Sequence, residues 1–322
     1  MDEKIKFMFE RLDSRFDVLT QVLEAVHLGS ALSSRIELRA PWALHFAATD
    51  RRAGFHVVVA GDCHVRLDAG GTAALGQGDV VVFPHGAGHT LCDHPETPSV
   101  ELHDLVAELP PGGRIALPCG EDGEPATVLC GSYSFAADGA NPLLRGLPDL
   151  LHLPAEEIRG GPLEVAVRML ADEAEGTGPG MALIVDRLVD LLFVHALRAW
   201  ICQRPHAGAG CWFGALQDPV VGPAIRAIHD DPARGWTVAA LAQHSRLSRA
   251  AFARRFHKAA GEPPLNYVTR WRMTMAADLL EKGARIAEVA HQVGYDNEFA
   301  FAKAFKRVRG ITPGRFRRRY AR

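Results

Sequence analysis

The last hundred residues contain one pattern twice, and this internal repeat constrains the fold more than any other feature. Four positions recur 48 residues later, where Val238, Leu241, Ala242 and Leu247 become Ile286, Val289, Ala290 and Tyr295. Five positions recur 49 residues later, where Phe252, Phe256, Gly261, Pro264 and Tyr267 become Phe301, Phe305, Gly310, Pro313 and Phe316. The second copy therefore has one extra residue in its turn. Such a repeat indicates a structural unit that occurs twice.

Each copy predicts a helix, a tight turn and a second helix. In the first copy, residues 238–242 have a helical apolar face, and residues 245–247 form the turn. Ser248 is then placed to cap a helix that carries Phe252 and Phe256 four residues apart. This is the helix-turn-helix arrangement, whose second helix can enter the major groove of DNA.

The second copy follows the same plan after a connecting helix. Residues 265–281 predict this connecting helix, with Gly283 as its C-terminal cap. Residues 286–293 form the next apolar face, Gly294 permits the turn, and Asp296 or Asn297 can cap the second helix.

Charge separates the two halves of the chain. Residues 218–322 contain 20 Lys and Arg against 9 Asp and Glu, whereas the remaining residues contain 16 against 29. The nearly neutral whole, with a formal net charge of −2, thus joins an acidic N-terminal part to a basic C-terminal part. This asymmetry favours nucleic-acid binding by the C-terminal half.

Residues 219–320 resemble the double helix-turn-helix domain of the AraC/XylS transcription regulators. The resemblance includes their closing pattern, which here reads Gly294-Tyr295, Phe301, Phe305-Lys306, Gly310-Ile311-Thr312-Pro313 and Phe316-Arg317. It implies sequence-specific binding to double-stranded DNA, with promoter half-sites as targets and RNA polymerase as a further expected partner.

The same resemblance places base contacts on the exposed positions of the two second helices. The expected residues are Arg249, Ala250, Ala253 and Arg254 in the first copy, and Asn297, Glu298, Ala300 and Lys303 in the second. Arg and Lys suit guanine, Glu can accept from cytosine, and Ala can touch a thymine methyl group. We expect Arg254 and Lys303 to matter most, and the phosphate contacts to come from Arg255, Lys306 and Arg307.

The N-terminal part predicts a different class of structure. Residues 2–28 have the apolar period of an amphipathic helix. Short apolar segments follow at 42–46, 55–59, 63–67, 79–83, 99–105 and 127–135. Their spacing is typical of an antiparallel barrel or sandwich.

Two motifs in this region resemble those of cupins. Gly78, Pro84, Gly86 and His89 match the second cupin motif, and residues 55–61 match a degenerate first one. With the Cys130-Gly131 element, the region resembles the cupin-like domain of an AraC subgroup that includes reactive-chlorine-sensing regulators. The predicted fold class is therefore α+β in two domains, an N-terminal cupin-like antiparallel β-barrel with flanking helices and a C-terminal all-α double helix-turn-helix.

Cysteine and histidine residues leave three alternatives open in the barrel. Cys119 and Cys130 flank a segment, 120–123, that predicts a hairpin. They can be structural thiols, they can bind Zn²⁺ together with His56 and His89, or they can be an oxidant-sensitive pair. Cys92, near His89, is a second candidate for oxidation. An apolar effector contacted by Trp42, His45 and His56 is a further alternative.

Two helices predicted between residues 141 and 205 favour dimerisation. The second, over 181–203, is apolar on most of its circumference and must be buried, either in a dimer interface or against the barrel itself. The predicted organisation is a helical segment (1–35), a cupin-like domain (36–140), a helical dimerisation region (141–205), a linker (206–218) and the DNA-binding domain (219–322).

The sequence thus predicts a transcription regulator whose cupin-like domain senses a signal and alters DNA binding by a homodimer. The N-terminus lacks the basic region of a signal peptide, no apolar run is long enough to cross a bilayer, and the scattered cysteines favour a reducing cytoplasm. The alternative is a cupin-type metal-dependent enzyme, an isomerase or dioxygenase. Only His56 remains of the ligands in the first cupin motif, which argues against that alternative.

Overall fold

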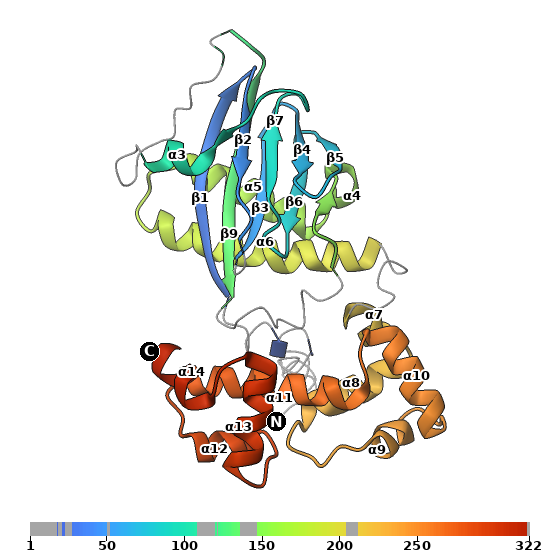
Figure 1. The fold of residues 1–322 in the computed structure, drawn as a ribbon. Coiled ribbons are helices and arrows are strands. Elements are labelled where there is room, and N and C mark those ends of the chain that lie inside the picture. The colour runs from blue at the N-terminus through green and yellow to red at the C-terminus, as the bar shows by residue number, and fades with distance from the viewer. Residues whose placement is uncertain are drawn as a thin grey trace, which may run out of the picture. The chain divides into compact units, whose positions relative to one another are not determined.

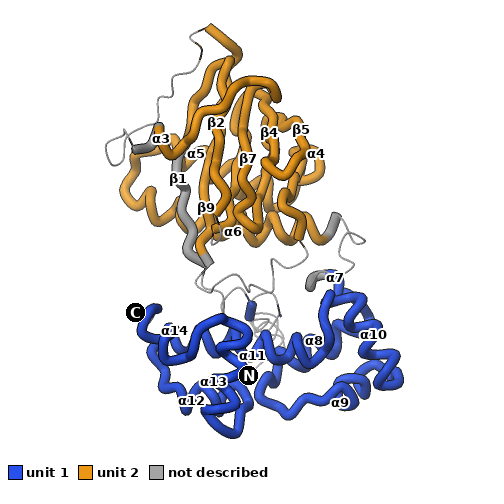
Figure 2. The backbone as a smooth tube through the Cα atoms, in the orientation of Figure 1, with its two compact units in different colours: residues 1–28, 135–146, 205–322 blue, residues 29–134, 147–204 orange. Residues whose placement is uncertain are grey.

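The computed structural model describes residues 28–49, 52–107, 122–135, 147–203 and 212–320, together with Val18, Gln21, Val22 and Gly120. These residues fall into a β-rich unit, residues 29–134 and 147–204, and a helical unit that contains residues 205–322 (Figure 2). The division agrees with the predicted α+β class. Among the described residues, no helix is both long enough and apolar enough to cross a membrane.

The β-rich unit is built from two five-stranded sheets (Figure 1). The first has the order β1 (Leu28–Arg39), β9 (Pro125–Phe135), β3 (Arg52–Ala60), β6 (Val80–Phe83) and β10 (Leu151–Leu153). The second has the order β5 (Thr72–Leu75), β4 (Cys63–Leu67), β7 (His89–Cys92), β2 (Ala43–Phe46) and β8 (Val100–Glu101). Pairing is antiparallel for β3 with β6 and β9 and for β7 with β2 and β4, whereas β2 and β8 are parallel.

The core of this unit lies between the sheets. Alternate residues of each strand point inward, as a pleated strand requires. Ile36 and Val128 come from the first sheet, Leu44 and Leu91 from the second, and all four are buried in one cluster. This alternation determines which face of each strand a polar residue occupies, and it therefore positions the histidines described below.

The N-terminal prediction needs correction. The helix expected over residues 2–28 lies almost wholly outside the described residues. The predicted helical segment covers residues 1–35. This prediction is wrong for residues 28–35, because β1 begins at Leu28. The reason is visible at its end, where Ile36 and Leu38 are buried while Glu37 between them is exposed. An alternation of this kind has the period of a strand.

Five of the six predicted strands are confirmed as β2, β3, β4, β6 and β9. The strand predicted over 99–105 is largely wrong, because β8 ends at Glu101 and α3 (Leu102–Ala107) follows immediately. The prediction also missed β5, β7 and β10, each of which has three or four residues.

Helices predicted after the barrel are confirmed. A short α4 (Ala155–Ile158) precedes α5 (Pro162–Glu175) and α6 (Met181–Gln203). The two longer helices pack against each other, and the Tyr133 hydroxyl of β9 donates a hydrogen bond of 3.1 Å to the Val189 carbonyl oxygen of α6. This contact attaches α6 to the outer face of the first sheet.

The helical unit confirms the repeat. The first copy consists of α9 (Val238–Gln243) and α10 (Arg249–Ala260), and the second of α12 (Ile286–Gln292) and α13 (Glu298–Arg309). Between them lies α11 (Pro264–Glu281), which ends before Gly283 at a positive φ of 84°. The described residues of this unit contain three more helices, α7 (Trp212–Gln217), α8 (Val221–Asp230) and α14 (Pro313–Tyr320).

Candidate nucleic-acid interface and cupin interior

Helix α10 has one buried face and one exposed basic face. Phe252 and Phe256 are fully buried, and the predicted contact residues Arg249 and Arg254 are exposed. The helix begins at Ser248, whose Oγ accepts a hydrogen bond of 3.3 Å from the backbone N–H of Ala251. The fold thus directs arginines outward because the phenylalanines hold the opposite face in the core. Of the remaining predicted positions, Ala250 is exposed and Ala253 is half-buried.

Helix α13 has the same arrangement. Its buried face is formed by Phe301 and Phe305, and Glu298, Ala300 and Lys303 are exposed. Of the two predicted caps, Asn297 is the one used, because its Oδ1 accepts a hydrogen bond of 2.8 Å from the Ala300 backbone N–H. Asn297 was also predicted to contact bases, and its side-chain oxygen is already engaged in capping. Its amide nitrogen is the group left to face a base.

The predicted phosphate contacts divide into two sets. Lys306 and Arg307 are exposed in the last turns of α13. Arg255, in contrast, forms an ion pair of 3.2 Å with Asp218, which also accepts hydrogen bonds from the backbone N–H groups of Val220 and Val221. Burial acts to raise the pKa of Asp218, but the two backbone hydrogen bonds and Arg255 outweigh it and hold the pKa below its usual value. Arg255 therefore serves the structure of the helical unit as well as any phosphate.

One exposed residue of α13 was missed by the sequence analysis. Phe299 is 82% exposed and immediately follows Glu298. Its equivalent in the first copy is Ala250, which was included among the predicted contacts. The repeat alignment contained this signal, since it places residue 250 opposite residue 299.

The polar groups inside the barrel form one continuous line. His56 on β3 and Cys130 on β9 are directly opposite in the strand register, and His56 Nδ1 lies 3.0 Å from Cys130 Sγ. His56 Nε2 lies 2.8 Å from His89 Nε2, and His89 Nδ1 lies 2.7 Å from the Ala87 carbonyl oxygen. The His89 ring is stacked between Phe46 and Phe83. The structure therefore brings together three of the four predicted metal or redox residues.

The hydrogen bonds fix where each proton lies. A carbonyl oxygen can only accept, so His89 Nδ1 carries a proton and His89 Nε2 accepts from His56 Nε2–H. His56 Nδ1 then accepts from the Cys130 thiol. Burial lowers the pKa of His56 well below its usual value and the pKa of His89 to about 4, and burial raises the pKa of the Cys130 thiol. All three groups are neutral, and both histidines are satisfied within the core.

A metal site at this position is not preformed among the described residues. Cys130 and His89 contact opposite nitrogens of the His56 ring, so the three side chains do not converge on one point. Across the described ranges, no group of three or more His, Cys, Asp and Glu is arranged to hold a metal ion. The fourth predicted residue, Cys119, lies outside those ranges.

Cys92 does not share the environment of His89. His89 and Leu91 face the barrel interior, so Cys92, three residues from His89 on the same strand, faces the opposite side of β7. Its thiol is buried, and burial raises its pKa. Its Sγ donates to the His64 carbonyl oxygen at 3.7 Å, a group that cannot take up the thiol proton, whereas Cys130 contacts a histidine nitrogen.

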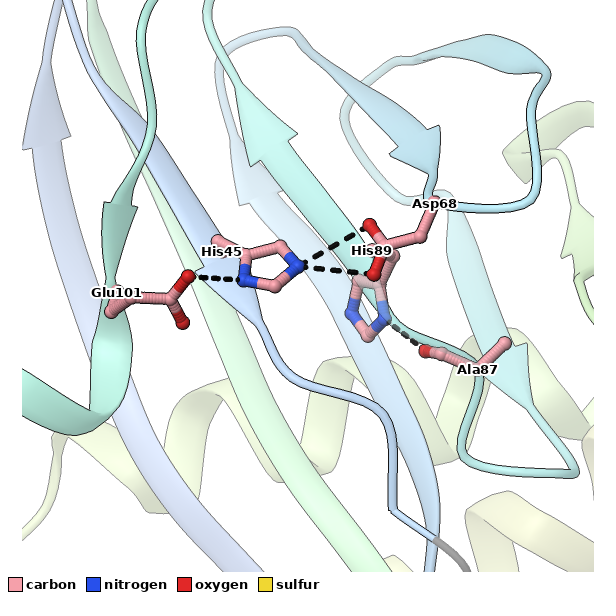
Figure 3. Close-up of polar contacts among 5 residues, drawn as sticks. All are labelled: His45, Asp68, Ala87, His89 and Glu101. Carbon is pink, nitrogen blue, oxygen red and sulfur yellow. Dashed lines mark hydrogen bonds and ion pairs between the residues drawn. The ribbon is translucent and has the colours of Figure 1, made fainter.

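The predicted ligand residues Trp42, His45 and His56 are not brought together. Trp42 and His56 are buried, whereas His45 lies on the outer face of β2, where its side chain is 21% exposed. There, His45 Nδ1 lies 2.7 Å from Glu101 and Nε2 lies 3.1 Å from Asp68 (Figure 3). Both carboxylates accept, so both ring nitrogens must carry protons. The Glu101 hydrogen bond is the largest influence on the raised pKa of His45; burial opposes it, and Asp68 adds to it.

A cavity of about 310 Å³ lies beside this cluster. Its lining includes Ala87 and four polar side chains, Thr49, Asp68, His85 and Asp149. The His85 ring donates through Nε2 to the Leu147 carbonyl oxygen at 3.0 Å. None of the three predicted ligand residues lines this cavity.

The chain combines two helix-turn-helix units, which have basic outer faces, with a cupin-like barrel. This combination defines a DNA-binding regulator that has the barrel as its second domain. Residues 17–202 match the family Cupin_6, described as a cupin, and residues 241–319 match HTH_18, described as a helix-turn-helix domain.

Two similar regulators agree with this class. The chain is 35% identical over 304 residues to an AraC-like transcription regulator of Streptomyces lividans, a match that covers 94% of this chain and 98% of that protein. It is 30% identical over 257 residues to the RCS-specific HTH-type transcriptional activator RclR of Escherichia coli K12, covering 74% of this chain and 88% of that protein. The DNA-binding domain of AdpA, whose structure was solved in complex with a target DNA, is 30% identical in sequence. The match covers 32% of this chain and 94% of the AdpA domain, with a TM-score of 0.30. The chain belongs to the AraC-like transcription regulators.

Proposed function

We propose that this DNA-binding regulator reads two neighbouring major-groove segments with α10 and α13. The observation that carries this proposal is the equivalent exposure of Arg254 and Lys303, which are 49 residues apart and lie opposite the buried phenylalanines of their helices. These two residues contact base edges, together with Arg249 and Glu298. Lys306 and Arg307 contact phosphates and add affinity without sequence information.

We further propose that the protein acts as a homodimer through α5 and α6. Both helices expose large apolar side chains, namely Val165 and Met169 on α5 and Leu183, Ile184 and Leu191 on α6. A second copy of the same surface would bury them, as the self-complementary interface of a two-fold dimer requires. The dimer would then present two DNA-binding units to two half-sites.

The sensing step is proposed to act on the line formed by Cys130, His56 and His89. This line is a polar feature within an apolar core, and any reagent that removes the thiol proton must also change the hydrogen bonding of His56. One relative is named as RCS-specific, and the proposal that this chain responds to an oxidant is supported by that likeness. Zinc is the alternative ligand, and its binding would require His56 to release one of its two hydrogen bonds.

One set of measurements on the full chain tests these proposals. Sequences selected from a randomised DNA library should bind with an affinity that falls steeply with salt, because phosphate contacts release counterions. Leu191→Glu should shift sedimentation from dimer to monomer, and Ala182→Glu, which adds the same charge at an exposed position of α6, should not. Absence of any selected sequence would refute DNA reading by these helices.

The signal is identified by metal analysis and thiol counting before and after mild oxidant. Loss of thiols with a change in DNA affinity, abolished by Cys130→Ser, supports oxidation. About one zinc per chain that is lost in the same variant supports a metal. If Cys130→Ser retains the full response, this line is not the sensor.

A further inference from the structure

Phe299 is the most exposed of the large apolar side chains in the described residues. It is 82% exposed, whereas the next, Leu183, is 62% exposed. An aromatic side chain that is exposed to water does not contribute the favourable free energy that its burial would give. A single exposed apolar residue is common on protein surfaces, but this one lies in the first turn of the helix proposed to read DNA.

The fold of α13 does not depend on Phe299. Its core contacts come from Phe301 and Phe305, both fully buried, and its first turn is capped by Asn297. Residue 299 is two positions from residue 301, which turns its side chain about 200° away around a helix of 3.6 residues per turn. The phenyl ring therefore faces away from the core.

The neighbours of Phe299 on this face are cationic. Residues four and seven positions further along a helix lie on the same side, and these are Lys303 and Lys306, which are both exposed. Phe299 thus begins a stripe that continues with the residue proposed to read a base and a residue proposed to contact a phosphate. A polyanion fits this stripe, because the two ammonium groups oppose docking by an uncharged apolar surface and favour phosphate.

The chemistry of the major groove gives the ring one apolar partner. A phenyl group cannot donate or accept a conventional hydrogen bond, so it cannot recognise the hydrogen-bond donors and acceptors of the bases. The 5-methyl group of thymine is the apolar group on the major-groove edges, and Phe is among the side chains that contact it. N-terminal residues of a recognition helix are the ones that reach base edges.

We infer that Phe299 is a specificity-determining residue that packs on the 5-methyl group of a thymine in the segment read by α13. This inference rests on the proposed placement of α13 in the major groove. The first copy has Ala250 at the equivalent position, whose single methyl group covers less of a thymine methyl than a phenyl ring does. The stronger thymine preference is therefore expected in the second segment.

The test uses the full-length protein and duplexes selected from a randomised library. In the preferred duplex, each thymine is replaced in turn by uracil, which removes only the methyl group. For the wild-type protein, one substitution should weaken binding about fourfold, the expected effect of one buried carbon. Phe299→Ala should weaken binding to the thymine duplex and lose the dependence at that position only. Phe299→Leu should retain part of it.

Several outcomes would overturn the inference. Phe299→Ala with unchanged affinity and an unchanged uracil profile would show that the ring does not touch DNA. Unchanged DNA binding with lost activation in a reconstituted transcription assay would assign the ring to a protein partner instead. If the wild-type chain selects no sequence at all, the proposed function fails and the inference fails with it. Replacement of the exposed Phe299 removes no core contact, and circular dichroism checks that the variants are folded.

Discussion

The two helix-turn-helix units have the same backbone plan and expose different chemistry. Both second helices begin at a side-chain cap, bury two phenylalanines, and end at a glycine in the left-handed region, Gly261 at φ 74° and Gly310 at φ 76°. Their first turns differ, with Arg249 and Ala250 in α10 and Glu298 and Phe299 in α13. The comparison shows that the two copies hold their helices in the same way, whereas the surfaces proposed to contact DNA differ.

The turns of the two units also differ. Gly294 has a φ of 79°, and Arg246, its equivalent 48 residues earlier, has a φ of 53°. A residue with a Cβ atom is disfavoured in this region, whereas glycine is not. The first turn therefore holds strain that the second avoids.

The largest expected effect comes from making the second turn resemble the first. Gly294→Arg should lower the free energy of unfolding of the helical unit by about 2–4 kcal/mol, because strain at positive φ adds to a steric clash. A Cβ atom at Gly294 would lie 2.4 Å from the Ala233 carbonyl oxygen. Gly283→Ala is the matched control, since φ there is 84° and no atom lies within 4 Å of the added carbon. Urea unfolding measures both, and equal losses would contradict the clash.

Removing the two equivalent cations tests whether both units read DNA. Arg254→Ala and Lys303→Ala should each weaken binding to a selected duplex by about 1–3 kcal/mol and relax preference at different base positions. Lys282→Ala removes a charge outside α10 and α13, where Lys282 pairs with Asp278, and should have little effect. Fluorescence anisotropy at fixed salt measures the affinities. Loss confined to one variant would show that a single unit supplies the specificity.

The caps provide a smaller and separable effect. Asn297→Ala and Ser248→Ala should each cost about 1 kcal/mol of stability, with the greater loss at Asn297 because its capping bond is 2.8 Å against 3.3 Å at Ser248. Asn297→Ser retains a cap and removes the amide. If this variant is stable yet binds DNA as well as the wild type, Asn297 has no role at the bases.

The smallest effect is expected from relieving the first turn. Arg246→Gly should raise the free energy of unfolding by about 0.5–1 kcal/mol, because relief of strain exceeds the extra freedom of glycine in the unfolded chain. Arg246→Ala controls for loss of the guanidinium while keeping the Cβ atom. A lower melting temperature for Arg246→Gly than for Arg246→Ala would contradict the strain.

Local patterns predicted the helical unit well. The periodic apolar positions, Ser248 and the glycines after each helix define the elements of each repeat without reference to distant residues. Phe299 was missed although the repeat pairs it with Ala250, because a phenylalanine is expected in the core and only the structure shows this one to be 82% exposed.

Strand register explains what could not be predicted in the barrel. The sequence suggested Cys119 as the partner of Cys130 across a hairpin, and this stays a prediction because Cys119 lies outside the described residues. The register of β9 with β3 places His56 opposite Cys130. These residues are 74 positions apart, and such pairing depends on the whole sheet. Likewise, His45 and His56 are both polar residues on β-strands, and only the packing assigns one to the surface and the other to the core.

The interior line that ends at Ala87 has a direction. The carbonyl oxygen of Ala87 fixes the tautomer of His89, and His89 in turn fixes the tautomer of His56. His56 then orients the thiol of Cys130. No member of the line can therefore reverse its donor and acceptor roles alone. The three groups form one cooperative unit with two coherent arrangements, and only the present one satisfies the Ala87 carbonyl. Since Ala87 also lines the cavity beside Asp68, this line of hydrogen bonds joins the buried Cys130 thiol to a residue at the wall of that cavity.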